Sequence, residues 1–549
     1  MTGWDPATLE ILWSRLVHIA DECWVTIART AFSTIVGEAG DFACEILDGR
    51  GESIAHSPRS MPVFNLTLPR AVKALLSAFP PESLEEGDVL ITNDPWMCAG
   101  HLFDVAIVTP VYRAGRLVGL VGSIAHWSDI GGTKDPGHAR EIYEEGLQIP
   151  PVKLYRAGRR NEDLVALIRR NVRNPEMVFG DLQAQVASNH VGAQRLLAFL
   201  EEVDLQTLEP LAEEVQRRAE IAMRQAIRSL PDGTYRSRIG FELMGRPASL
   251  GCEVRIEGEE LTVDWVEAPP EQPVGALNCT YSYTAAHTVY ALKCLLTPQI
   301  PSNAGCFRPL RVRAPLGSVL NCRYPVATSQ RTLVGWLLAP ALFASLQEVV
   351  PDRVQAFSGL PASVSAYGYD ASGNAFHDHI MFGGGQGAGR FTDGRSALMF
   401  PTSAGNVPVE MFEQRTPILV ERKELIPDSG GPGAHRGGLG QRVVLRKLAD
   451  DGRPVLLHIL THAVGRPVPG LLGGEPGRDA RVWCEGTASI GRAGASILVE
   501  LCHPDQRVVV ETAGGSGFGD PGRRAREAIE RDLEEGYVTS WPHKLPQGE

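Results

Sequence analysis

The chain has 549 residues, of which 43% are hydrophobic and 21% charged, so it is long enough for two or three globular domains. Its formal net charge is −12 and it has no basic block, which argues against nucleic acid as a partner. No run of about 18 apolar residues is present that could span a membrane. Residues 1–6 lack the basic region and apolar core of a secretion signal, so we expect a cytoplasmic protein.

The ten cysteines are scattered along the chain, and none forms a Cys-x-x-Cys motif. Scattered thiols in a long chain are typical of reduced core residues and not of a disulfide framework.

The apolar periodicity predicts an α+β chain of mixed helices and strands in three regions. Residues 1–230 form an α/β region with a helical segment, 231–350 a mixed α/β region, and 351–549 a β-rich region with glycine loops and a C-terminal helix. The individual predictions are helices over 6–34, 69–79, 161–230, 285–296, 340–350 and 523–535, and strands over 41–48, 88–92, 105–111, 117–125 and 236–270.

Histidine and aspartate residues stand at the ends of two of these strand-like runs. His101 and Asp104 precede the run 105–111, and His126 and Asp129 follow the run 117–125. The short link between the runs is typical of a turn, so a hairpin would bring the four side chains together.

Two imidazoles and one or two carboxylates at one place suit a divalent metal such as Zn, Mn or Fe. The same spacing also arises in an ordinary surface pair of hydrogen-bonded side chains. Gly131 and Gly132 leave both interpretations open, because a glycine pair serves a close approach to a ligand as well as a simple turn.

The glycine-rich segments do not form a nucleotide-binding motif. They lie at 382–390, 429–440 and 512–520, and none contains the Gly-x-x-x-x-Gly-Lys-Ser/Thr pattern of a phosphate-binding loop. The chain also lacks a Gly-x-Ser-x-Gly nucleophile elbow. Packing of loops is the better explanation for these glycines.

Taken in order, many short segments resemble the hydantoinase B/5-oxoprolinase family, whose members include the metal-bearing subunits of acetone and acetophenone carboxylases. The resemblance runs from about Pro6 to Pro521. It is carried by residues 29–33, 41–44, 93–95, 100–105, 125–132, 144–154, 174–175, 180–185, 300–309, 406–410, 428–431, 436–440 and 514–521.

The resemblance implies a metal site made by an aspartate after the first helix, a His-x-x-Asp pair and a histidine on the next strand. In this sequence these are Asp41, His101, Asp104 and His126. Zn, Mn and Fe all remain possible with such ligands. A structural zinc site in a scaffold subunit would more often use cysteine, so the absence of cysteine from this set favours catalysis.

The sequence departs from the family pattern at three places, one of which is a shorter segment after Asn321. Where many members carry His-His-x-Asp, this chain has Trp127 after His126. The tryptophan could line a substrate site or fill the core. In place of an aromatic-aromatic-Glu stretch it has His377 and His379, which could bind metal or form an exposed loop pair.

The resemblance implies an enzyme that works with ATP bound on a partner, a hydantoinase A-like subunit of the actin/acetate-kinase type, in a hetero-oligomer. We expect an ATP-dependent hydrolase of cyclic amides, and the alternative is a ketone carboxylase. Asp129 and Glu145 are the candidates for a general base or for a residue that supports the metal ligands.

Overall fold

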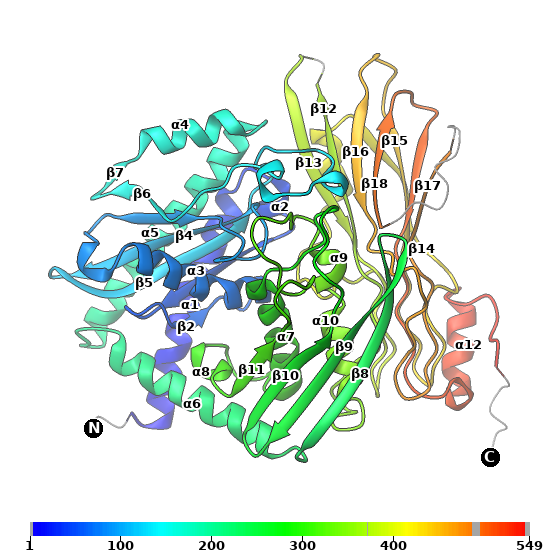
Figure 1. The fold of residues 1–549 in the computed structure, drawn as a ribbon, viewed down its shortest axis with the longest axis horizontal. Helices are drawn as coiled ribbons and strands as arrows, with labels where there is room; N and C mark the ends of the chain where they lie inside the picture. Colours follow the sequence, from blue (N-terminus) through cyan, green and yellow to red (C-terminus); the bar gives the residue numbers. More distant parts are fainter. Residues whose placement is uncertain (1–3, 371, 486–494, 544–549) are drawn as a thin grey trace. The chain divides into compact units, whose positions relative to one another are not determined.

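The computed structural model describes residues 4–370, 372–485 and 495–543, and it contains both helices and several β-sheets (Figure 1). Contacts divide the chain into two compact units. The first comprises Met1–Gly233, Arg255–Val263 and Glu271–Arg331, and the second comprises Thr234–Val254, Asp264–Pro270 and Thr332–Glu549. The predicted α+β class is confirmed, and the division into three regions stays a prediction.

The first unit combines long helices with short and medium strands. In chain order it contains α1 (Pro6–Thr30), α2 (Thr34–Gly37), β1 (Phe42–Leu47), β2 (Ser53–His56), α3 (Pro62–Ala78), β3 (Val89–Thr92), β4 (Asp104–Arg113), β5 (Arg116–His126), β6 (Val152–Arg156), β7 (Arg159–Arg160), α4 (Glu162–Asn171), α5 (Pro175–Glu202), α6 (Glu209–Arg228), α7 (Tyr281–Leu296), α8 (Ala304–Phe307) and β11 (Leu310–Arg313). The strands β8 (Gly233–Leu243), β9 (Arg246–Glu257) and β10 (Glu260–Glu267) form a four-stranded sheet with β11, in the order β11-β10-β9-β8.

The second unit is rich in strands. It contains α9 (Thr332–Gly335), α10 (Leu338–Ser345), β12 (Ala362–Tyr369), β13 (Ala375–Phe382), α11 (Val409–Arg415), β14 (Ile418–Leu425), β15 (Gln441–Lys447), β16 (Val455–Leu460), β17 (Arg481–Glu485), β18 (Ser496–Leu501), β19 (Arg507–Glu511) and α12 (Arg526–Glu534). Two four-stranded antiparallel sheets result, in the orders β13-β12-β16-β18 and β14-β15-β19-β17.

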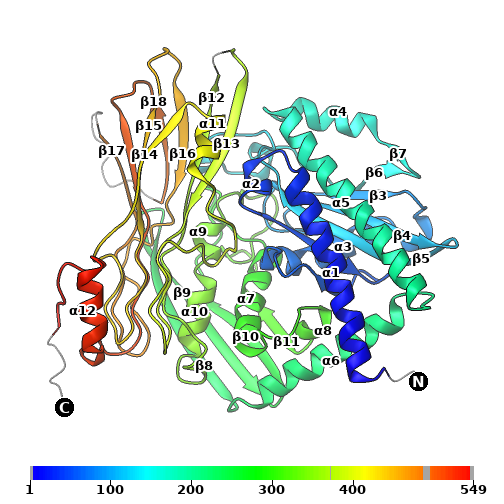
Figure 2. The ribbon, with the colours of Figure 1, turned by 180° about the vertical axis from the view of Figure 1, so that it is seen from behind.

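The first unit is built on a seven-stranded antiparallel sheet in the order β2-β1-β5-β4-β3-β6-β7. Helices α1 and α5 cover one face (Figure 2). On that face Phe42 of β1 stacks on Trp24 of α1 with ring centroids 4.9 Å apart. Helix α3 covers the other face, because a Cβ added at Gly122 of β5 would lie only 3.2 Å from Leu68 of α3. The strands are therefore buried on both faces, which explains their almost continuous apolar runs.

Gly192 lets α5 approach both α1 and the sheet. A Cβ at this position would lie 2.5 Å from Sγ of Cys23 and 2.9 Å from a methyl group of Val121. We expect Gly192→Val to lower the free energy of unfolding by about 1–3 kcal/mol, because overpacking forces the helix away from its neighbours. The exposed Gln194→Val on the same helix controls for helix propensity and should cost less than about 0.7 kcal/mol. Equal urea midpoints for the two variants would contradict this packing.

Several predicted helices have different bounds in the structure, among them the helix expected at 340–350, which is α10 and ends at Ser345. The helix expected at 69–79 begins at Pro62, and Pro69 lies inside α3 instead of in its first turn. Burial of the apolar side chains around Pro69 holds the helix together despite the lost hydrogen bond. The helix expected at 6–34 is interrupted after Thr30, where Ala31 is extended and Ser33 caps the short α2.

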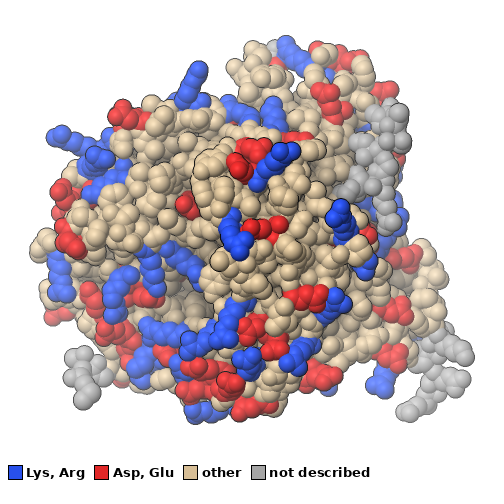
Figure 3. All heavy atoms as spheres, viewed as in Figure 1, with Lys and Arg blue, Asp and Glu red and all other residues tan. Residues whose placement is uncertain are grey.

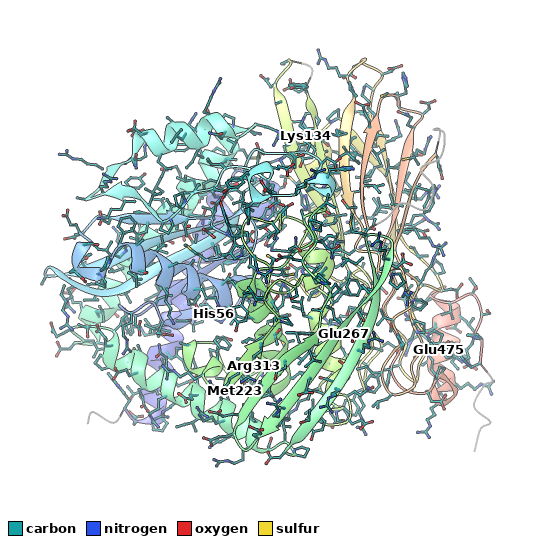
Figure 4. All side chains as sticks on the ribbon, in the orientation of Figure 1. His56, Lys134, Met223, Glu267, Arg313 and Glu475 are labelled. Atoms are coloured by element: carbon teal, nitrogen blue, oxygen red, sulfur yellow. The ribbon has the colours of Figure 1, made fainter. Side chains whose placement is uncertain are left out.

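Helix α6 carries a charged outer face and an apolar inner one. Glu214 pairs with Arg217 and Glu220 pairs with Arg224 on the outer face. Figure 3 shows acidic and basic side chains interspersed over this region. Met223, which is labelled in Figure 4, is fully buried on the inner face. The helix therefore exposes its charged residues to solvent and is anchored through its apolar face.

The glycine-rich segments pack backbone against backbone, as loop packing requires. A Cβ at Gly385 would lie 1.9 Å from the carbonyl oxygen of Gly438, and one at Gly437 would lie 1.9 Å from the oxygen of Gly515. No side chain fits at such positions, so the three segments need glycine for their mutual contact. All ten cysteines are free, and no helix among the described residues has the length and apolar character needed to cross a bilayer.

Candidate metal centre

The predicted hairpin forms, and its register brings the histidines and aspartates together. β4 and β5 pair antiparallel with Asp104 opposite His126 and Val105 opposite Ala125. The strand ends thus place an imidazole and a carboxylate side by side. His101 reaches the same place through the turn that precedes β4.

Gly100 makes this turn possible. Its φ of +92° lies in the region that favours glycine, and a Cβ there would lie 2.9 Å from Tyr283 and 3.0 Å from Arg331. A larger residue would therefore displace both the turn and the two side chains that pack behind it.

Three donor atoms converge at the strand ends. Nε2 of His101 lies 2.8 Å from Oδ1 of Asp104, and Nδ1 of His126 lies 3.3 Å from the same oxygen. The donor atoms of all three residues lie within 4.8 Å of one another. This is the one group of three or more such residues found in the described part of the chain.

Asp41, the fourth predicted ligand, borders this group. It directly precedes β1, which pairs with β5 so that Phe42 faces Ala125. Its Oδ2 lies 3.8 Å from Nδ1 of His126, and its backbone oxygen accepts the N–H of His126 at 3.1 Å. The predicted ligands therefore lie in one place, on three adjacent strands.

The residues fit a divalent cation. Nε2 of His101 and Oδ1 of Asp104 are buried, yet neither makes a properly directed hydrogen bond, although they are only 2.8 Å apart. Buried polar atoms are nearly always hydrogen-bonded, and an ion between these donors would satisfy both. Imidazole and carboxylate donors without cysteine suit Zn, Mn or Fe and do not choose among them.

The charge states of the group also suit metal binding. Burial lowers the pKa of His101 to about 3, so its imidazole is neutral and needs to lose no proton. Burial raises the pKa of Asp104, but the neighbouring His101 and Arg331 outweigh it and hold that pKa below its usual range. Burial raises the pKa of Asp41 to about 6, so Asp41 is ionised at neutral pH.

Trp127 belongs to the core. It is fully buried and packs in a cluster with residues of the sheet and of α5. Its Nε1 donates to Oε1 of Gln185 at 3.0 Å, and Gln185 in turn donates to the backbone oxygen of Val105 at 3.1 Å. Of the two interpretations of this departure from the family pattern, the structure supports core filling.

Asp129 lies under the loop that follows β5. Its Oδ1 accepts the N–H of Gly131 at 3.0 Å and a guanidinium N–H of Arg173 at 2.8 Å, and its Oδ2 accepts the backbone N–H of Arg173. The same guanidinium donates to the carbonyl oxygens of Gly131 and Gly132. Asp129 thus holds the two glycines in place, and both of its oxygens accept hydrogen bonds.

Glu145 is buried beneath the segment 328–331. Its Oε1 accepts the backbone N–H groups of Thr328 at 2.9 Å and Ser329 at 2.7 Å. Burial raises its pKa to about 7, although these hydrogen bonds act in the opposite direction.

The raised pKa of Glu145 predicts a pH-dependent contribution to stability. A carboxyl whose pKa is higher in the folded chain than in the unfolded one stabilises the fold below about pH 4.5, and this contribution is lost as pH rises through 7. A shift from 4.5 to about 7 corresponds to about 3 kcal/mol. Urea unfolding at pH 5 and pH 8 should show wild type losing stability relative to Glu145→Gln at the higher pH. The same difference in unfolding free energy between wild type and Glu145→Gln at both pH values would contradict the raised pKa of Glu145.

His377 and His379 lie far from this group in sequence, in β13 of the second unit, and form no exposed loop. The ring of His377 stacks on Tyr367 at 4.2 Å, and Nδ1 of His379 lies 2.9 Å from Oγ of Ser365. Neither belongs to a cluster of three metal-binding side chains in the described ranges.

Arg331 is the functional candidate that the sequence did not reveal. Its guanidinium donates a hydrogen bond to Asp104, which lies 227 positions earlier in the sequence. A single arginine carries no spacing signal that could have predicted this contact.

A sequence profile of the hydantoinase B/oxoprolinase family matches residues 5–521. The chain belongs to this family. It is 30% identical to the B subunit of a putative D-/L-hydantoinase of Pseudomonas sp. strain NS671, over 97% of this chain and 93% of that protein. The hydantoinase B resemblance is therefore confirmed.

Two solved structures share the fold of this hydantoinase B family chain. The ATP-dependent caprolactamase from Pseudomonas jessenii superposes with a TM-score of 0.85 at 27% identity, covering 98% of this chain and 95% of that chain. A nucleotide-free acetone carboxylase superposes with a TM-score of 0.84 at 19% identity, covering 97% and 78%. At that lower identity the second likeness concerns the fold alone.

Proposed function

We propose that this chain is the metal-bearing subunit of an ATP-dependent hydrolase of cyclic amides. The observation that carries the proposal is the convergence of His101, Asp104 and His126 on one point, in a chain whose relatives are named as a hydantoinase subunit and a caprolactamase. A separate ATP-binding subunit completes the enzyme in this proposal, because the sequence has no phosphate-binding loop.

In this proposal Asp41, His101, Asp104 and His126 hold one divalent ion. When bound, such an ion supplies Lewis acidity, which polarises an acyl or phosphoryl oxygen and lowers the pKa of water to near neutrality. Without an ion, the carboxylates of Asp41 and Asp104 and the guanidinium of Arg331 give this group one net negative charge. A divalent ion would bring the group to one net positive charge. That balance suits a negatively charged reactant.

The activated substrate provides such a negative charge. The partner would transfer a phosphoryl group from ATP to the amide oxygen, which turns that oxygen into a leaving group. Attack of one water on the same carbon, followed by cleavage of the C–N bond, would free the amine and leave an acyl phosphate. A second water would hydrolyse that acyl phosphate to inorganic phosphate and the ring-opened amino acid. The unactivated amide resists this attack, which accounts for the use of ATP.

Asp129 and Glu145 act through other residues in this proposal. Asp129 holds Gly131 and Gly132 through Arg173, and the backbone of Glu145 lies directly against Gly132. The hydrogen bonds of both carboxylates favour a supporting role over that of general base.

The experiment is an assay of this chain co-purified with its ATP-binding partner. Phosphate release and product are followed with hydantoins, lactams, 5-oxoproline and ketones, with and without bicarbonate. We expect ATP turnover that depends on a cyclic amide, needs no bicarbonate and yields a ring-opened product. Turnover that requires bicarbonate and a ketone would overturn the proposal and identify a carboxylase. The complex stripped of metal with a chelator is the control and should be inactive until metal is restored.

A further inference from the structure

Arg331 lies behind the proposed ligand set and is almost fully buried, with 5% of its surface exposed. Its Nη2 donates to Oδ2 of Asp104 at 2.8 Å, and its Nε donates to the backbone oxygen of Ala99 at 3.0 Å. The guanidinium also lies 4.5 Å from the ring centre of Tyr283. A buried arginine bound on three sides has little freedom to move.

The two oxygens of Asp104 thus have different surroundings. Oδ2 is taken by the guanidinium, whereas Oδ1 faces the donor nitrogens of His101 and His126 at 2.8 and 3.3 Å. Without a fixed donor on Oδ2, rotation of the carboxylate could offer both oxygens to an ion. With the donor in place, only Oδ1 is available.

The segment that carries Arg331 is held independently of any ion. Glu145 accepts the backbone N–H groups of Thr328 and Ser329, and the N–H of Gln330 donates to Ala276 at 2.8 Å. The carbonyl oxygen of Arg331 lies 3.4 Å from Sγ of Cys279. These bonds hold the backbone from which the guanidinium extends.

We propose that Arg331 is a positioning residue that commits Asp104 to bind the metal through Oδ1 alone. The inference rests on the metal site proposed above. The residues that support metal ligands typically change metal affinity by 10- to 100-fold when they are replaced.

The test uses the full chain with metal ions alone, without the ATP-binding partner or substrate. Arg331→Met removes the charge and all donors at similar length, and Arg331→Lys keeps the charge but loses the planar fork. Arg323→Met is the matched control, because Arg323 lies in the same stretch of chain but is exposed and pairs with Glu271 at the surface. Chelator competition gives the Kd for Zn²⁺, the visible spectrum of bound Co²⁺ reports the coordination, and thermal melting verifies the fold.

We expect Arg331→Met to weaken Zn²⁺ binding by 10- to 100-fold and to weaken the visible bands of Co²⁺, because a second carboxylate oxygen raises the coordination number. Arg331→Lys should lie between wild type and Arg331→Met, since one ammonium cannot reach both Ala99 and Asp104 at the same distances. Arg323→Met should match wild type. Folded Arg331 variants with wild-type Kd and spectrum would overturn the inference and leave the proposed function intact. A wild-type chain that binds none of Zn²⁺, Mn²⁺ and Fe²⁺ would instead overturn the metal site itself.

Discussion

Replacing His126 by alanine is expected to weaken metal binding by at least about 100-fold and to abolish activity of the assembled enzyme, while the chain remains folded. The imidazole stands at the end of β5 and shares Oδ1 of Asp104 with His101, so its loss removes one of three converging donors. The strand itself keeps its pairing, because the backbone N–H of residue 126 still bonds Asp41. His101→Ala should behave in the same way.

The measurement is metal content by elemental analysis after dialysis, together with the melting temperature. His138→Ala is the matched control, since His138 is strongly exposed and pairs only with Asp135 at 2.8 Å. Its metal content and activity should equal those of wild type. Unchanged metal content in both His101→Ala and His126→Ala would remove the site.

Replacing Asp532 by asparagine is expected to cost about 3–5 kcal/mol of stability in the second unit. Asp532 of α12 is buried and accepts both Nε and Nη2 of Arg436, at 3.1 and 3.2 Å, as well as Nη2 of Arg524 at 2.6 Å. Both guanidiniums are buried as well. The amide removes the carboxylate that binds the buried guanidinium of Arg436, whereas Arg524 retains its bonds to Asp393 and to the carbonyl oxygen of Ala434.

The measurement is the urea midpoint of the full chain, followed by fluorescence and circular dichroism. Glu530→Gln provides the control on the same helix, because Glu530 pairs with Arg526 at the surface, where both side chains are exposed. Surface pairs contribute about 0–1 kcal/mol, so this variant should unfold close to wild type. Similar losses in the two variants would show that the buried network does not anchor α12.

The sequence alone was sufficient for the elements with a clear period and for the prediction that His101, Asp104 and His126 lie close together. The apolar runs around 105–111 and 117–125 predicted the hairpin, and the structure has it with Asp104 opposite His126. The ligand residues lie at strand ends only a few positions apart, so strand pairing by itself brings most of them together. Asp41 was reached through the family resemblance and not through local spacing.

Element boundaries near prolines could not be determined from the sequence. Pro69 marks a helix start by its usual preference, yet it lies inside α3, because burial of the neighbouring apolar residues outweighs the lost hydrogen bond. The sequence also did not reveal the end of α1 at Thr30, because the helical pattern continues although Ala31 is extended.

Only the tertiary structure decided which side chains support the ligands. Arg331 is hydrogen-bonded to Asp104 although 227 positions separate them in the sequence. The hydrogen-bonded pairs Arg173–Asp129 and Trp127–Gln185 are separated by 44 and 58 positions. Periodicity describes neighbours on one element, and it carries no information about polar contacts between elements that folding brings together. The residues that could hold the ion were therefore readable from the chain, whereas the residues that hold those ligands in place were decided by packing.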